Sequence, residues 1–244
     1  MNHFWDTSET IPDGLGFSYF GKEHMICLLL CGTVLLVGTF AYRMFDKGQR
    51  RRFRNVLVAV VLSAELFKQI ALILTGRWLP CYLPFHLCNV NVFIILWHSV
   101  RPNTLLSNFL YGICLPAAVA AILFPGWDDL PAWNFMYIHS WILHVSLALY
   151  PMALFVVGDI KPRLKDAWKS LLLLAGMALV LYCFNNWMQK IGIHVNFFFL
   201  RTVAKNNPLY FFQKIWGNHL YGFPFVVVVV FSIMYFPIEI KRMK

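Results

Sequence analysis

The sequence has few charged residues for its length. Asp, Glu, Lys and Arg make up 13% of the 244 residues, whereas about a quarter of a soluble domain is charged. Hydrophobic residues reach 59%, and apolar runs of roughly 18 or more residues, each long enough to cross a bilayer, recur along the whole chain. We therefore expect a multi-pass protein of the cell membrane with little room for a soluble domain.

Signatures of several other protein classes are missing. The sequence has no glycine loop for phosphate and no H-E-x-x-H motif, and its six cysteines lack metal-ligand spacing. The first twenty residues contain Asp6, Glu9 and Asp13 in place of a basic stretch followed by an apolar run, so no signal peptide is expected. The net charge of +10 comes from basic residues in short loops. We expect no metal ion, no cofactor and no nucleic-acid partner, and the sequence sets no oligomeric state.

Apolar runs between charged or Pro/Gly-marked breaks predict an all-α protein with seven transmembrane helices. They are expected at residues 25–44, 55–75, 82–100, 104–124, 133–157, 167–189 and 219–237, after an extracytoplasmic segment 1–24 and before a cytoplasmic tail 238–244. Basic residues concentrate at one set of span ends, notably in segments 43–54 and 161–169. The positive-inside rule then places the N-terminus outside and the C-terminus in the cytoplasm.

Polar side chains lie within the outer halves of four of these spans, roughly 5 to 16 Å deep by helical rise. They are Glu65, Lys68, His86, Cys88, Asn89, Asn91, His139, His144, Asn185 and Asn186. The inner halves of the same spans are expected to be nearly free of such groups. Because polar groups at membrane depth usually face the bundle interior or a wet cavity, we expect a polar cavity that opens toward the outer leaflet.

Each of these residues also has a purely structural interpretation. Glu65 and Lys68 are three residues apart on one helical face, which suits an ion pair as well as a direct role. Asn89 and Asn91 can join helices by hydrogen bonds. His139 and His144 are separated by about 140° on a regular helix, so both need not point into one cavity.

Cys88 is the candidate nucleophile. A thiol reacts as its thiolate, which a base or a positive field favours. We expect the third span to begin at Pro84, which places Cys88 near the positive end of the helix. Residues two apart on a helix face away from each other, so the base is sought on the fifth span, at His139 or His144, while His86 binds phosphate or orients Asn89.

The long connection at residues 190–218 is aromatic and amphipathic. It is interpreted either as a segment lying at headgroup depth or as a lid over a site on the outer side.

The segments "LPFHLC", "ILHVSLALYP" and "NFFFLR" resemble elements of the YwaF-like bacterial integral membrane proteins. That family is distantly similar to the transmembrane-protein-164 lipid acyltransferases and to the androgen-induced membrane hydrolases. The resemblance implies that Cys88 is the nucleophile and that His144 or His139 is the base.

Three functions are therefore weighed. The first is a membrane-embedded lipid acyltransferase or lipid ester hydrolase, whose partner is a membrane phospholipid or other acyl donor, with Asn89, Asn185 or Asn186 stabilising the oxyanion. The alternative is a transporter or small-molecule binding protein that uses a Glu/Lys/His cavity. A purely structural or chaperone role is the third possibility.

Overall fold

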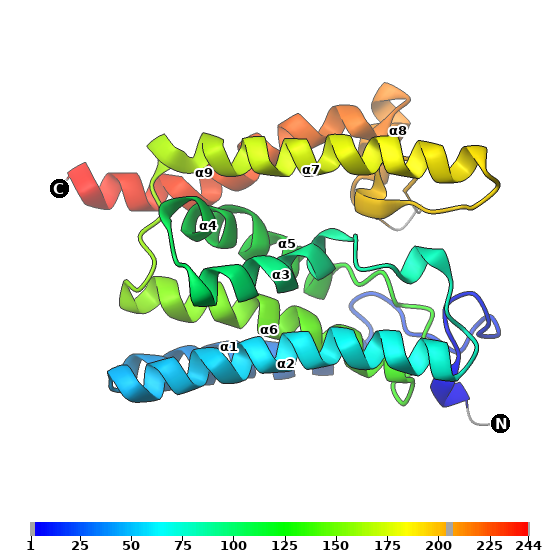
Figure 1. Ribbon diagram of the computed structural model, residues 1–244, viewed down its shortest axis with the longest axis horizontal. Coiled ribbons are helices and arrows are strands. Elements are labelled where there is room, and N and C mark those ends of the chain that lie inside the picture. The colour runs from blue at the N-terminus through cyan, green and yellow to red at the C-terminus, as the bar shows by residue number, and fades with distance from the viewer. Residues whose placement is uncertain (1–2, 204–206, 244) are drawn as a thin grey trace.

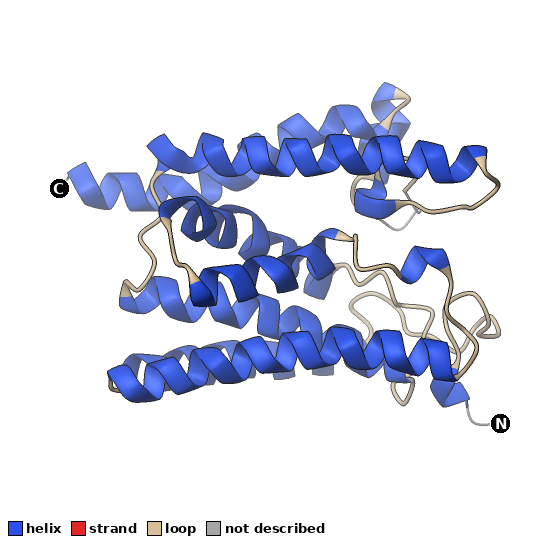
Figure 2. Ribbon diagram, in the orientation of Figure 1, coloured by secondary structure: helices blue, strands red, loops and turns tan. Residues whose placement is uncertain are grey.

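The computed structural model of the protein describes residues 3–203 and 207–243, and this part of the chain forms helices and loops without any strand (Figure 1, Figure 2). Seven helical segments are long and apolar enough to cross a membrane: Lys22–Met44, Lys47–Leu74, Pro80–Val100, Thr104–Leu123, Phe135–Val157, Leu164–Lys190 and His219–Arg242. The predicted all-α, multi-pass membrane architecture is thereby confirmed. The side of the membrane on which the N-terminus lies stays a prediction.

The α-helices are α1 (Lys22–Met44), α2 (Lys47–Leu74), α3 (Leu87–Val100), α4 (Thr104–Phe109), α5 (Leu115–Leu123), α6 (Phe135–Val157), α7 (Leu164–Lys190), α8 (Tyr210–Trp216) and α9 (Gly222–Met243). Shorter turns complete the chain: η1 (His3–Trp5), η2 (Pro80–Tyr82), the π-helical η3 (Leu110–Cys114), η4 (Phe197–Phe199) and η5 (His219–Tyr221).

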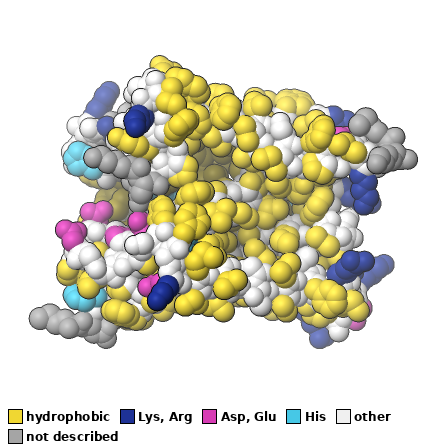
Figure 3. All heavy atoms as spheres, turned by 180° about the vertical axis from the view of Figure 1, so that it is seen from behind, with side chains coloured by type: hydrophobic (Ala, Val, Ile, Leu, Met, Phe, Trp, Pro, Cys, Tyr) yellow, Lys and Arg dark blue, Asp and Glu magenta, His cyan; other side chains and the backbone are white. Residues whose placement is uncertain are grey.

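Helix α6 is the centre of the bundle. It packs against α1, α2 and α5, while α7 packs on α4 and α9 contacts η3. Figure 1 shows the resulting layers, with α1, α2 and α6 on one side, α3 to α5 in the middle, and α7 and α9 on the other side. Hydrophobic side chains cover the middle of the face in Figure 3, and charged side chains lie at its two ends, as a bilayer requires.

Helix α2 begins eight residues before the predicted span, within the basic segment. Asp46 and Gln49 form a capping box, in which the Gln49 N–H donates to Asp46 Oδ1 at 2.8 Å and Gln49 Oε1 accepts from the Asp46 N–H at 3.0 Å. This local signal starts a helix regardless of the hydropathy of the residues that follow. At the other end of the chain, α9 continues as far as Met243 through most of the segment 238–244 that was expected to be a tail.

The fourth span contains a π-helical turn, η3, because of a proline. Pro116 has no N–H, and its ring would clash with the carbonyl of Gly112 four residues earlier in a regular helix. The Leu115 N–H bonds instead to the Leu110 carbonyl, which widens the turn. Gly112 faces α9 there, and a Cβ at this position would lie 2.9 Å from Tyr235 Oη.

Replacing Gly112 with alanine should therefore lower the free energy of unfolding by about 1–3 kcal/mol, because the added methyl group overpacks the contact between η3 and α9. Thermal unfolding in detergent measures the effect. Gly32→Ala on α1 is the matched control, since a Cβ at Gly32 meets no atom within 4 Å. An unchanged unfolding temperature for Gly112→Ala would contradict the close packing of α9.

A second proline, in α6, provides a hydrogen-bond acceptor for the Cys114 thiol. Pro151 lies inside α6 and leaves the carbonyl of Leu147 without its helical partner. The Cys114 thiol donates to this carbonyl at 3.5 Å, and both residues are fully buried. Cys114 is thus a packing residue with one specific hydrogen bond.

The inner halves of the spans were predicted to be nearly free of polar groups, but the structure shows several polar groups there. Tyr42 donates to Asp159 at 2.5 Å, and Arg54 lies 3.6 Å from the same carboxylate. His98 is hydrogen-bonded to Tyr150 at 3.1 Å. The prediction was wrong because it followed the deeper ionisable residues and passed over tyrosines and groups near the span ends.

Asn108 was also overlooked in this inner half. Its Oδ1 accepts from the Arg163 N–H at 2.9 Å and from the Tyr235 hydroxyl at 3.0 Å. The side chain is fully buried, and it joins α4 to α9 and to the loop before α7.

Candidate functional site

The segment "LPFHLC" enters the membrane through a turn, and α3 begins later than predicted. Pro84 lies before the helix, the Phe85 N–H donates to the Leu83 carbonyl at 2.7 Å, and His86 is the N-cap residue with extended backbone. The expectation that the helix starts at Pro84 was therefore wrong by three residues. Cys88 consequently lies in the first turn of α3, where backbone N–H groups have no helical partner.

Glu65 and Lys68 form a buried ion pair on α2. Lys68 Nζ lies 2.9 Å from Glu65 Oε2, and the two side chains are 6% and 7% exposed. Asn89 of α3 donates from Nδ2 to the same carboxylate oxygen at 2.5 Å. This arrangement ties the first turn of α3 to α2.

Gln69 completes this group and was not predicted from the sequence. Its Nε2 donates to Glu65 Oε1 at 2.8 Å and to the Tyr82 carbonyl at 2.7 Å. The Trp78 indole N–H donates to Gln69 Oε1 at 2.9 Å. The available signal was the spacing of four residues from Glu65, which places both side chains on one helical face.

Lys68 is the common neighbour of the predicted thiol and histidines. Its ammonium interacts electrostatically with His86, Cys88, His139 and His144. Groups from α2, from the start of α3 and from α6 thus share Lys68 as a charged neighbour. We call these five residues the Lys68 cluster.

Cys88 is a partly exposed residue. Its Sγ donates weakly to Asn89 Oδ1 at 3.7 Å, and the backbone N–H groups of Cys88 and Asn89 face the sulfur. In the described part of the chain, no hydrogen bond joins Cys88 to a histidine. A proton moving between them therefore needs a water molecule or a substrate atom as a bridge.

His144 has a defined tautomer. Its Nδ1 lies 2.7 Å from the carbonyl oxygen of Ser140. Since a carbonyl can only accept a hydrogen bond, Nδ1 carries the proton and Nε2 has a free lone pair in the neutral ring. Trp127 stacks on this imidazole at 4.8 Å with an interplanar angle of 21° and fixes its orientation.

His139 and Asn91 differ from the other site residues because they have no partner. Both are buried, at 7% and 1% exposure. Neither ring nitrogen of His139 and neither amide atom of Asn91 makes a hydrogen bond to the residues that the structure describes. His139 interacts electrostatically with His144 and Lys68 despite the angular separation of the two histidines on α6.

The amide of Asn185 is occupied by the backbone of the connection between α7 and α8. Its Nδ2 donates to the Phe197 carbonyl at 3.0 Å, and its Oδ1 accepts from the Phe197 N–H at 3.1 Å. These bonds favour a structural role for Asn185 over contact with substrate. Asn186 lies beside it, partly exposed on α7.

The turn η4, which Asn185 holds through the two hydrogen bonds to Phe197, covers His86. The Phe197 ring is fully buried, 5.2 Å from the His86 ring and 5.5 Å from the Phe85 ring. Phe198 and Phe199 both have positive φ, at 58° and 54°, which bulky side chains rarely adopt. This packing favours a lid over a segment that simply lies at the membrane surface.

An apolar groove runs beside the first turn of α3. It has a volume of about 530 Å³ between Phe85 and Val90 on one side and α7 residues from 172 to 181 on the other. Cys88 lies in the sequence between the two α3-side residues. The groove lies on the lipid-facing surface near the start of α3, and Cys88 is not among its lining residues.

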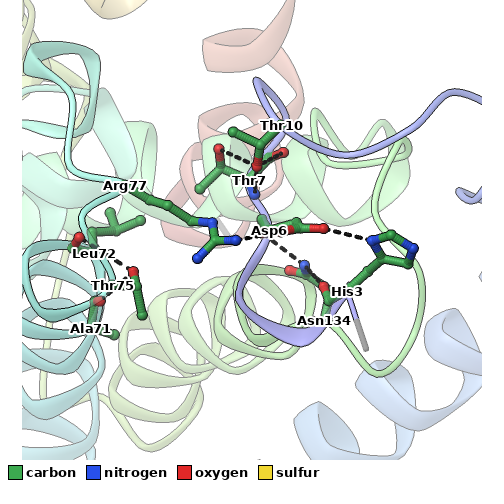
Figure 4. A network of polar contacts seen from close by, with 9 residues as sticks. All are labelled: His3, Asp6, Thr7, Thr10, Ala71, Leu72, Thr75, Arg77 and Asn134. Carbon is green, nitrogen blue, oxygen red and sulfur yellow. Dashed lines mark hydrogen bonds and ion pairs between the residues drawn. The ribbon is translucent and has the colours of Figure 1, made fainter. Parts of the chain in front are cut away.

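The N-terminal segment is fastened over the same end of the bundle (Figure 4). Arg77 donates to Asp6 at 2.8 Å, and Asp6 pairs with His3 at 2.6 Å. The hydrogen bond from His3, together with the Arg77 guanidinium, holds the pKa of Asp6 below its usual value. Asn134, at the start of α6, donates to the carbonyls of His3 and Asp6 at 2.9 and 2.8 Å, so this segment joins α6 to the loop after α2.

Comparison with known proteins gives one match. A family model described as the TMEM164 family matches residues 19–235, which is most of the chain. No curated protein and no solved structure shows a significant match. The family match supports the resemblance to the transmembrane-protein-164 proteins, whereas the YwaF-like likeness receives no support from it and stays a prediction.

Proposed function

The chain belongs to the TMEM164 family, and on this basis we propose that it is a membrane-embedded lipid acyltransferase or lipid ester hydrolase with Cys88 as its nucleophile. The observation that carries the proposal is the position of Cys88. Cys88 is a partly exposed residue in the first turn of a helix, and its thiol interacts electrostatically with the buried Lys68 ammonium. Helix N-termini and neighbouring cations are the surroundings in which cysteines become reactive.

His144 is the better candidate for the base. Its Nδ1–H is held by the Ser140 carbonyl, so Nε2 can accept a proton. Trp127 keeps the ring in place. In the first step, the thiol proton passes through a bridging water to His144, and the sulfur attacks the ester carbonyl of the lipid.

The free N–H groups at the start of α3 suit the developing oxyanion. The N–H groups of Cys88 and Asn89 already face the sulfur, whereas the side-chain amides of Asn89 and Asn185 are engaged elsewhere. Collapse of the tetrahedral intermediate breaks the ester C–O bond, and the leaving alcohol takes the proton from His144. The acyl group then remains on Cys88 as a thioester until a hydroxyl group attacks it.

The groove between α3 and α7 offers room for the acyl chain. Its apolar lining suits an acyl chain from the bilayer better than a charged headgroup. The transport alternative receives less support, because Glu65 is held by Lys68, Asn89 and Gln69 together and has no free oxygen to bind an ion.

Trapping of the acyl-enzyme tests the proposal. Purified protein in detergent is incubated with an alkyne-tagged phospholipid and with a p-nitrophenyl fatty ester, and the adduct is located by peptide mass spectrometry. We expect a hydroxylamine-labile acyl group on Cys88, since hydroxylamine cleaves thioesters. Cys81 lies seven residues earlier and serves as an internal control within the same peptide. The absence of any adduct, or an adduct on Cys81 alone, would refute the proposal.

A further inference from the structure

Asn91 and His139 carry buried polar atoms that have no partner among the described residues. Asn91 is 1% exposed and His139 is 7% exposed, yet two amide atoms and two ring nitrogens stay unpaired. More than nine in ten buried polar groups in native structures have a hydrogen-bond partner, because leaving one unpaired is costly. Two such side chains indicate a place that a polar ligand fills.

Asn91 lies on the same face of α3 as Cys88. Asn91 is three residues after Cys88 on α3, so both side chains lie on one face of the helix, about 4.5 Å apart along its axis. Ile95 continues this face and is fully buried in the core. Helix α3 packs against η3 and α6. His139 lies on α6, five residues before His144, and both interact electrostatically with Lys68.

The chemistry of the two side chains selects the ligand. An amide offers both a donor and an acceptor, and a neutral imidazole does the same. Lys68, the cation of this cluster, is already paired with Glu65 at 2.9 Å. Asn91 and His139 therefore suit an uncharged ligand group that both donates and accepts hydrogen bonds. A hydroxyl group has this property.

We propose that Asn91 and His139 form the subsite for the acceptor hydroxyl that removes the acyl group from Cys88. This inference rests on the proposed function. In the step, the acceptor oxygen attacks the thioester carbonyl, its proton passes to His144 Nε2, and the C–S bond breaks. The departing thiolate then takes that proton, which regenerates the Cys88 thiol and the neutral imidazole. The hydroxyl belongs to a lipid alcohol in transfer and to water in hydrolysis.

Burst kinetics separate the two halves of the reaction. With p-nitrophenyl decanoate, acylation of Cys88 gives a burst of p-nitrophenolate, and the following steady rate reports deacylation. Added lysophospholipid should raise the steady rate of the wild-type protein if a lipid hydroxyl enters the subsite. If water alone is the acceptor, the steady rate stays the same with and without lysophospholipid.

The test compares Asn91→Leu and His139→Leu with the wild-type protein. Both variants should keep the burst amplitude, whereas the steady rate should fall about 10- to 100-fold through loss of hydrogen bonds to the acceptor. Asn55→Leu is the matched control, because Asn55 is exposed on α2 and outside the cluster. It should change neither phase.

Stability is measured on the same variants. Leucine in place of an unpartnered amide should leave the unfolding temperature of Asn91→Leu at or above the wild-type value. A fall in unfolding temperature for both variants would mean that the side chains are structural, and it would overturn the inference. Unchanged steady rates, or loss of the burst together with the steady rate, would also overturn it. Absence of a burst in the wild-type protein would instead refute the proposed function on which the inference rests.

Discussion

Replacing Cys88 with alanine is expected to lower the rate of lipid ester turnover by about 10⁴-fold or more, the size of effect seen when a catalytic nucleophile is removed. Without the thiol, no acyl group can be held between donor and acceptor. The measurement is the release of fatty acid, or its transfer to lysophospholipid, by purified protein in nanodiscs. The burst of p-nitrophenolate should disappear together with turnover.

Cys183→Ala provides the matched control. Cys183 is an exposed cysteine of α7, outside the Lys68 cluster, and its removal should leave turnover unchanged. Cys88 is only partly buried, so Cys88→Ala should unfold within a few degrees of the wild-type protein. Full turnover by a well-folded Cys88→Ala protein would show that this thiol is not the nucleophile.

Replacing Glu65 with leucine should lower the free energy of unfolding by about 3–5 kcal/mol, because it leaves the Lys68 ammonium buried without a counter-charge. The Nδ2 of Asn89 and the Nε2 of Gln69 lose the same carboxylate. Unfolding in detergent with increasing denaturant measures the effect. Asp166→Asn is the control, since Asp166 and Lys169 form a pair of the same i, i+3 spacing at 3.1 Å on the surface, with Lys169 49% exposed.

The double variant Glu65→Leu with Lys68→Met identifies the cause. Removing both charges should recover most of the lost stability, because an ion pair and an apolar pair of similar volume are often close in stability. The Asp166→Asn change should cost less than about 1 kcal/mol. If the double variant is as unstable as Glu65→Leu alone, the loss comes from packing or from Asn89, and the buried charge is not its cause.

The seven spans were predictable because length and hydropathy determine them almost alone. Helix starts depend on local chemistry that hydropathy ignores. The capping box of Asp46 and Gln49 begins α2 inside a basic segment, and the turn after Pro84 delays α3 until Leu87. Both signals are present in the sequence, but they concern single hydrogen bonds rather than average polarity.

The candidate site was predictable in its members more than in their roles. The depth comparison selected Glu65, Lys68 and Asn89, which do meet in the structure. Gln69 was not among the predicted residues, although its spacing of four from Glu65 places both side chains on one face of α2. The partner of Asn185 is the backbone of Phe197 in an irregular loop, and no periodicity in the sequence indicates such a contact.

Two hydrogen bonds between Asn185 and the Phe197 backbone link helix α7 to the turn that covers His86. Asn185 belongs to α7, whose middle forms one wall of the apolar groove, while Phe197 covers His86. A tilt of α7 away from α3 therefore widens the groove and withdraws Phe197 from His86 in the same movement. Widening of the groove and uncovering of His86 are therefore coupled through the two hydrogen bonds between Asn185 and Phe197.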